Sequence, residues 1–340
     1  MCNKWLAENA GAPIKYILTN DKNYIPEVLE NFEVKYWLSK LKDRADNKDL
    51  SNIHGSHDYR YEIIVKNCAI LGLSKYIPSF DENIKYVLDF LNRHIKNKDI
   101  EQEKLSFGKM YAYRDYETVL ACYLPELGYQ DDEAVRYIAE KRINITYNFT
   151  KQKRYDIYVD GSKFKGVKRE WQPYIINPEL YSDGNIALPS YHDYILFAGI
   201  YKYLGKELQR KVDNTIEWLF SDEYIKLKGR YGYFYAEGGN YNAKAILVSL
   251  KLLDFKNILI EKEYLSGLLN TVYILSHFKT VIKHDWFNMA LAYLNDYKIS
   301  DGLYKFPSNM IMNIGENKKA KKYREIVSTY WMYRINKNLK

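Results

Sequence analysis

The chain has 340 residues, of which 47% are apolar and 28% charged, and its net charge is +8. This composition is typical of a globular protein and excludes a collagen-like repeat, a disulfide scaffold and an extended disordered chain. Tyrosine is the exception, with 35 residues against 13 phenylalanines. The excess indicates either a compositional bias of the genome or a large cavity lined by aromatic side chains.

The three cysteines are far apart, and we expect Cys68 and Cys122 to be buried thiols in a reducing cytosol. The first residues lack the continuous apolar core of a signal peptide, and no run of about 18 apolar residues predicts a membrane span. We therefore expect a cytoplasmic chain without a membrane span. The positive charge is spread along the sequence, which does not favour a nucleic-acid partner.

Apolar residues recur with the period of an α-helix through most of the chain. They predict helices over residues 28–41, 63–71, 84–95, 116–123, 133–147, 194–204, 207–220, 241–253, 262–277, 286–297 and 323–336. Residues 151–189 and 226–240 interrupt this pattern with strand-like runs and glycines. Helix hairpins bury their apolar faces by stacking or by closing into a ring, so we predict an all-α fold, an α/α toroid of five or six hairpins. No linker divides residues 1–340, which predicts a single toroid domain with two short β or irregular insertions.

A short element precedes the first helix of each predicted hairpin: an aspartate, once an asparagine, followed by an aromatic residue. It occurs at Asp58, Asp115, Asp193, Asn240 and Asp285, and a histidine comes before it at His57, His192 and His284. An aspartate in this position is a favoured helix cap, which needs no catalytic role. In a closed ring, however, the first helices would line the cavity, and their N-termini would meet at one mouth.

The sequence therefore predicts acid/base chemistry at this mouth. The catalytic candidates are Asp58, Asp115, Asp193, Asp285, His57, His192 and His284, and the substrate-binding candidates are Tyr59, Tyr116, Tyr194, Asn240, Tyr241, Trp286, Trp171 and Tyr233. Neighbouring carboxylates raise each other's pKa, which suits one of them to act as an acid, and aromatic faces stabilise cations. The same histidines and aspartates could hold a divalent metal, but no metal-ligand spacing supports this. We expect no metal and no other cofactor.

The turns beside several predicted helices share a pattern. Residues 124–137 begin with Leu-Pro-Glu-Leu-Gly-Tyr, and glycine-aromatic turns occur at 229–235 and 301–306. These segments resemble the α/α-toroid repeats of the squalene-cyclase and protein-prenyltransferase superfamily. The resemblance implies the toroid and, with it, a terpenoid or prenyl substrate. The DxDD motif of the cyclases and the zinc ligands of the prenyltransferases have no counterpart at matching positions.

Three functions stay open at this point. The first is an enzyme acting on an apolar, isoprenoid-like substrate, which predicts that Asp58, Asp193 and Asp285 lie within about 10 Å of one another. The second is a glycoside hydrolase or lyase, which needs two carboxylates about 5–9 Å apart for hydrolysis. The third is a non-catalytic toroid or solenoid that binds a ligand or an anionic partner, which predicts a basic concave face. The expected ligand is a small apolar molecule or a glycan, and the sequence leaves catalysis and oligomeric state open.

Overall fold

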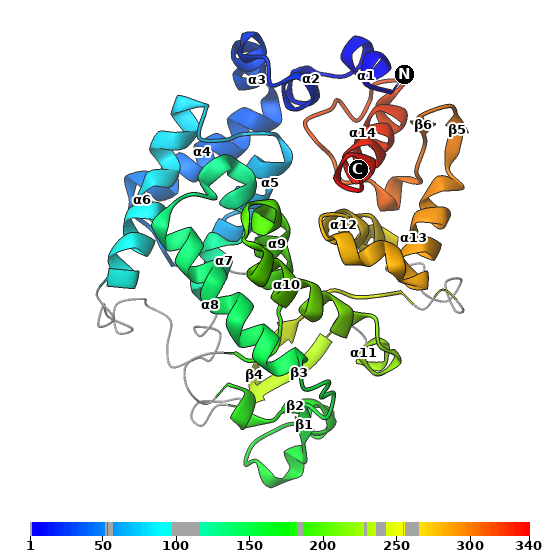
Figure 1. The fold of residues 1–340 in the computed structure, drawn as a ribbon. Coiled ribbons are helices and arrows are strands. Elements are labelled where there is room, and N and C mark those ends of the chain that lie inside the picture. The colour runs from blue at the N-terminus through cyan, green and yellow to red at the C-terminus, as the bar shows by residue number, and fades with distance from the viewer. Residues whose placement is uncertain are drawn as a thin grey trace.

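The computed structural model describes residues 2–51, 53, 57–96, 116–181, 186–227, 230–235, 243–253, 255 and 265–340. Most of them lie in helices, which agrees with the predicted all-α class (Figure 1). The helices are α1 (Cys2–Asn9), α2 (Ala12–Thr19), α3 (Ile25–Glu30), α4 (Phe32–Asp46), α5 (Tyr61–Ile70), α6 (Pro78–Lys96), α7 (Tyr116–Ala121), α8 (Glu133–Thr150), α9 (Tyr191–Ile200), α10 (Lys206–Leu219), α11 (Asp222–Lys226), α12 (Leu265–Leu275), α13 (Asp285–Asn295) and α14 (Tyr323–Asn338). The strands are β1 (Tyr158–Val159), β2 (Ile175–Ile176), β3 (Arg230–Tyr235), β4 (Ala243–Val248), β5 (Lys298–Ser300) and β6 (Leu303–Tyr304).

Two helix predictions need correction. The helix predicted over residues 28–41 is divided into α3 and α4, because the Asn31 side chain caps α4 by accepting hydrogen bonds from the main-chain nitrogens of Glu33 and Val34. The helix predicted over residues 241–253 is wrong, since this segment contains strand β4. Its apolar run suits a strand as well as a helix, and pairing with β3 decides between them.

The two predicted insertions come together in space. Strands β1 and β2 from residues 151–189 and strand β3 from residues 226–240 form one sheet with β4, in the order β1-β2-β3-β4. The β1–β2 and β3–β4 pairs are antiparallel, and β2 and β3 are parallel. Val167 and Ile175 form a small core on this sheet, separate from the main core of the helices.

Gly232 fixes the contact between β2 and β3. Its φ is +147°, and a Cβ atom at this position would lie 2.1 Å from the carbonyl oxygen of Tyr174. We expect Gly232→Ala to lower the free energy of unfolding by more than about 1 kcal/mol. Gly267 in α12 is the matched control, because a Cβ atom there would meet nothing within 4 Å. Gly267→Ala should raise the free energy of unfolding by about 0.5–1 kcal/mol. Urea denaturation of both variants measures the sign of the change in the free energy of unfolding. Equal changes in the two variants would contradict the role of Gly232 in the contact between β2 and β3.

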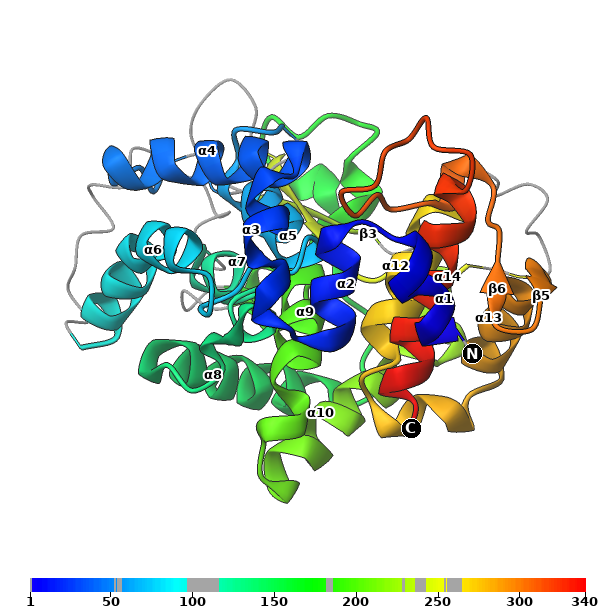
Figure 2. The ribbon, with the colours of Figure 1, turned by 90° about the horizontal axis from the view of Figure 1, so that it is seen from above.

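The two ends of the chain pack against each other. Helix α1 contacts α14, and Figures 1 and 2 show both near the two termini. The loop before α14 is tied to the N-terminal helices, since the Gly11 nitrogen donates to Glu316 Oε1 at 2.6 Å and Asn31 Nδ2 donates to the Gly315 carbonyl at 2.8 Å. Burial raises the pKa of Glu316.

Candidate ligand-binding site

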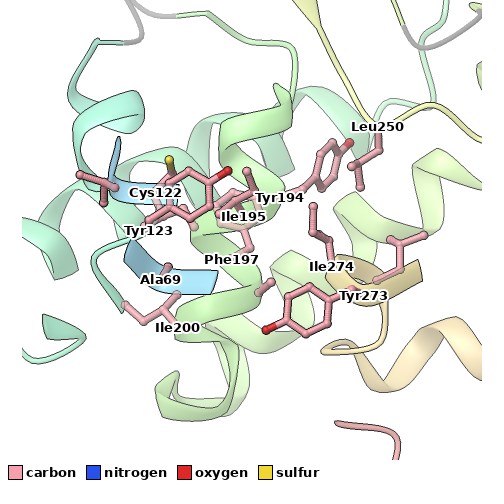
Figure 3. Packing of buried hydrophobic residues seen from close by; sticks show 14 of the residues in the cluster. Ala69, Cys122, Tyr123, Tyr194, Ile195, Phe197, Ile200, Leu250, Tyr273 and Ile274 are labelled. Carbon is pink, nitrogen blue, oxygen red and sulfur yellow. The ribbon is translucent and has the colours of Figure 1, made fainter. Parts of the chain in front are cut away.

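A cavity of about 590 Å³ lies between α2, α5, α9, α12, α14 and the turn that follows α7. Each of these helices contributes residues from its C-terminal half or from the residues just beyond its end. Figure 3 labels five of the lining residues, Ala69, Tyr123, Ile195, Tyr273 and Ile274, which come from α5, the segment after α7, α9 and α12. The cavity therefore lies at the end of these helices opposite to the predicted mouth.

Aromatic side chains form much of the wall. They are Tyr16, Tyr76, Tyr123, Tyr203, Tyr273, Tyr333 and Trp331. The rings of Tyr273 and Trp331 meet edge to face with their centroids 5.1 Å apart, and both side chains are buried. Six of the 35 tyrosines thus line this cavity.

The charge of the lining is mostly positive. It includes Lys66, Lys202, Arg334 and Lys337, against the single carboxylate of Glu126. Lys66 is half-buried, whereas Lys202 and Lys337 are exposed at the opening. Within the described ranges of the chain, none of the three lysines takes part in an ion pair. Their charges are available to a bound anion.

Glu126 and Arg334 form a network with Tyr273. Arg334 Nη2 donates to Glu126 Oε1 at 2.8 Å, and the Tyr273 hydroxyl donates to the same oxygen at 2.7 Å. The Arg334 guanidinium also lies over the Tyr273 ring, 4.7 Å from its centroid. Arg334 and the Tyr273 hydroxyl hold the pKa of Glu126 below its usual value although burial opposes this, so the carboxylate is ionised at neutral pH.

Helix α12 carries a polar stripe toward the cavity. Asn270 and Tyr273 line it from one face of the helix, and His277, four residues after Tyr273, lines it from the turn just beyond the end of α12. His277 Nδ1 lies 3.1 Å from the Tyr273 carbonyl oxygen. Burial lowers the pKa of His277, with Arg334 acting in the same direction and Glu126 against it, so the imidazole is neutral at pH 7.

The side chain of Asp193 is buried and its hydrogen bonds stabilise the fold. It is fully buried in the first turn of α9, where its side chain and that of Ser190 form a reciprocal capping box. Its two oxygens accept hydrogen bonds from Arg142 Nε at 2.7 Å and from Arg142 Nη2 at 2.8 Å. Arg142 also donates to the Ile186 carbonyl. This carboxylate is therefore engaged by groups that hold α8 against α9.

Asp58 and Asp285 lie in different surroundings from Asp193. Both are exposed, and Asp58 accepts a hydrogen bond from the Tyr36 hydroxyl, which lowers its pKa. Among the described residues, none of these three aspartates lines the cavity. Their positions relative to the helices also differ, since Asp58 precedes α5, Asp193 is the third residue of α9 and Asp285 is the first of α13.

The predicted histidines are paired or stacked elsewhere. His192 Nε2 lies 2.9 Å from Glu62 Oε1, and both side chains are buried. His284 Nε2 lies 2.8 Å from Glu217, and its ring stacks on Phe220. His57 is exposed and stacks on Tyr59. Each of these three histidines thus has a contact partner of its own.

The aromatic candidates pack into the protein at several places. Tyr194 is fully buried, Trp286 Nε1 donates to the Leu253 carbonyl at 2.8 Å, and the Tyr116 hydroxyl bonds His94. Trp171 and Tyr233 are brought together, because their rings stack 4.9 Å apart on the four-stranded sheet. None of these residues or Tyr59 lines the cavity. Asp115, Asn240 and Tyr241 lie outside the described residues.

The helices that line the cavity after strand β4 differ from those that the sequence pattern indicates. The sequence pattern places the 286–297 helix inside and the 262–277 helix outside, but the cavity is lined by α12 and α14 and receives no residue from α13. Residues 241–253, predicted as the first helix of the preceding hairpin, contain strand β4 instead, so the alternation of first and second helices is interrupted before α12.

The residues that line the cavity were not identified from the sequence, although one signal for them exists. In residues 265–277 leucine, valine and isoleucine alternate with polar residues, and Asn270, Tyr273 and His277 among the polar ones have helical spacing. A polar stripe on an apolar helix is typical of a wall that faces a cavity or a partner. Lys66, Lys202 and Lys337 carry no such signal, because lysine is common along the whole sequence.

Two other kinds of site are missing from the part of the chain that the structure describes. No three side chains of His, Cys, Asp or Glu lie close enough together to hold a metal ion. No helix there has both the length and the apolar character needed to cross a bilayer. Comparisons with family models, with curated proteins and with solved structures found no match for this chain.

Proposed function

We propose that the chain forms a closed α/α toroid and that its cavity binds a small organic anion. The ring rests on contacts that run from α5 to α7, α9, α12 and α14, continue through α1, α2, α3 and α4, and return to α5. The cavity is bounded by five of these helices and the turn after α7. A ligand between them would touch segments from both ends of the chain.

The observation that carries the proposal is the charge of the lining. Four cationic side chains meet one carboxylate, Glu126, which is already paired with Arg334. An anion would compensate the charge of the lysines, which an uncharged isoprenoid cannot do. The aromatic walls would pack against the body of that anion. This arrangement favours the third function considered from the sequence, ligand binding, over acid/base chemistry at a ring of aspartates.

The charge also separates the proposal from a glycoside hydrolase. Hydrolysis with two carboxylates needs both of them at the bond to be cleaved. Within the described lining Glu126 is the single carboxylate. Helix C-termini carry partial negative charge, so Lys202 just beyond α9 and Lys337 in the last turn of α14 also stabilise these helices. Binding must therefore be measured separately from stability.

Calorimetric titration with matched pairs tests the proposal. We expect glucose 6-phosphate and geranyl diphosphate to bind, glucose and geraniol to bind much more weakly, and the affinity for both anions to fall as salt is added. If geraniol binds as tightly as geranyl diphosphate, the anion site is contradicted and an apolar substrate is favoured instead. Binding of neither anion would also contradict the proposal.

A further inference from the structure

The cavity contains hydrogen-bonding groups that a plain anion would not use. Asn20, Asn270 and Asn338 place side-chain amides on the walls made by α2, α12 and α14. Asn270 Nδ2 donates to the Tyr191 hydroxyl at 2.9 Å, which orients its carbonyl oxygen as an acceptor. Amides donate and accept at one site, as do hydroxyl groups. Asn338 Nδ2 already donates to Ser276 Oγ at 3.0 Å, so a ligand without such groups would leave the Asn20 amide and the carbonyl oxygens of Asn270 and Asn338 without a partner.

Glu126 restricts more strongly which anions the cavity can bind. Its carboxylate lies among cations that attract an anion, and it repels that same anion. Both of its hydrogen bonds, from Arg334 and Tyr273, end on Oε1, and in the described part of the structure no hydrogen bond reaches Oε2. About a quarter of the side chain is exposed. Oε2 can therefore accept a hydrogen bond from a ligand that carries hydroxyl groups as well as a negative charge.

We propose that the anion is an acidic sugar, with its carboxylate or phosphate held by the lysines and one of its hydroxyl groups donating to Glu126 Oε2. This inference rests on the proposed function and names the class of its ligand. Sugar rings carry C–H faces that pack on tyrosine rings and hydroxyl groups that match the amides. A carboxylate and a phosphate make the same demand on lysine side chains, so the experiment distinguishes the two.

The test compares ligands that differ in one property. Glucuronate and cyclohexanecarboxylate both have a six-membered ring and a carboxylate, and only the first has hydroxyl groups. We expect glucuronate or glucose 6-phosphate to bind at least about tenfold more tightly than cyclohexanecarboxylate. Tighter binding of glucuronate than of glucose 6-phosphate would assign the acidic group as a carboxylate, and the reverse order would assign a phosphate, each within the proposal.

Glu126→Gln then tests the selecting residue. Glutamine retains an acceptor for Arg334 and Tyr273, removes the negative charge and replaces Oε2 by a donor. We expect cyclohexanecarboxylate to bind more tightly and the preference for the sugar anion to fall about tenfold. Glu140→Gln is the matched control, since Glu140 is exposed on α8 outside the cavity, and it should leave the preference unchanged. Circular dichroism checks that both variants fold.

The outcomes separate the two proposals. Cyclohexanecarboxylate that binds as tightly as both sugar anions would overturn the acidic-sugar inference and leave anion binding intact. A preference for the sugar anion that Glu126→Gln leaves unchanged would overturn the role of Oε2. If none of the charged ligands binds, anion binding itself is contradicted, and the inference about the sugar falls with it.

Discussion

Asp193→Asn should destabilise the fold by about 3–5 kcal/mol, because it removes one partner of a buried ion pair and leaves the other charged. Asp193 is fully buried, and both of its oxygens accept from Arg142, which is itself buried. Asparagine retains one acceptor but cannot balance the Arg142 charge. The capping box with Ser190 is weakened at the same time. Chemical denaturation with urea measures the loss.

Asp285→Asn is the matched control, since it makes the same substitution at an exposed aspartate of the same sequence element. We expect its free energy of unfolding to change far less than that of Asp193→Asn. Two variants that are equally stable would show that Asp193 is not held as described. A stable, folded Asp193→Asn protein that specifically loses ligand binding would restore the catalytic role predicted from the sequence.

Replacing Lys66, Lys202 and Lys337 together by methionine should weaken anion binding about 10- to 100-fold. Each lysine contributes a screened attraction of roughly 1 kcal/mol near a protein surface, and the three act on one ligand. Methionine retains much of the apolar length of lysine, so the packing of the cavity wall changes little. Calorimetric titration with glucose 6-phosphate and with glucuronate measures the loss, and the dependence of affinity on salt should become shallower.

Lys318→Met, Lys319→Met and Lys321→Met combined form the control. These lysines are exposed in the loop before α14 and do not line the cavity, and their replacement changes the net charge by the same amount. We expect this variant to bind the anion nearly as the parent does. Equal losses in both triple variants would mean that net charge alone attracts the ligand. A cavity variant that loses stability but keeps its affinity would mean that the lysines serve only the helix ends.

The sequence pattern predicts most helices because their apolar faces recur with the helical period, and α8, α10, α13 and α14 lie close to the predicted ranges. The pattern predicts the wrong element at residues 243–248. This run is apolar, and it forms a strand because it pairs with β3. Local periodicity contains no information about a strand partner.

The candidate site could not be predicted from the repeated aspartates, because similar sequence elements occupy different structural positions. Asp193 lies within a helix and pairs with Arg142, whereas Asp58 precedes a helix and bonds Tyr36. Capping and local ion pairing select aspartate at helix starts without any common function. Glu126 and Arg334, in contrast, are far apart in the sequence and meet only in the folded chain. Their pairing has no periodic signal.

The location of the bound anion tests the central claim most directly. A crystal structure of the complex with a bromophenyl glucuronide would place the ligand through the anomalous scattering of bromine. We expect the bromine and the sugar between α2, α5, α9, α12 and α14, with the carboxylate beside the lysines and a hydroxyl group at Glu126. A ligand bound instead at the helix N-termini, beside Asp58, His192 or Asp285, would contradict the account.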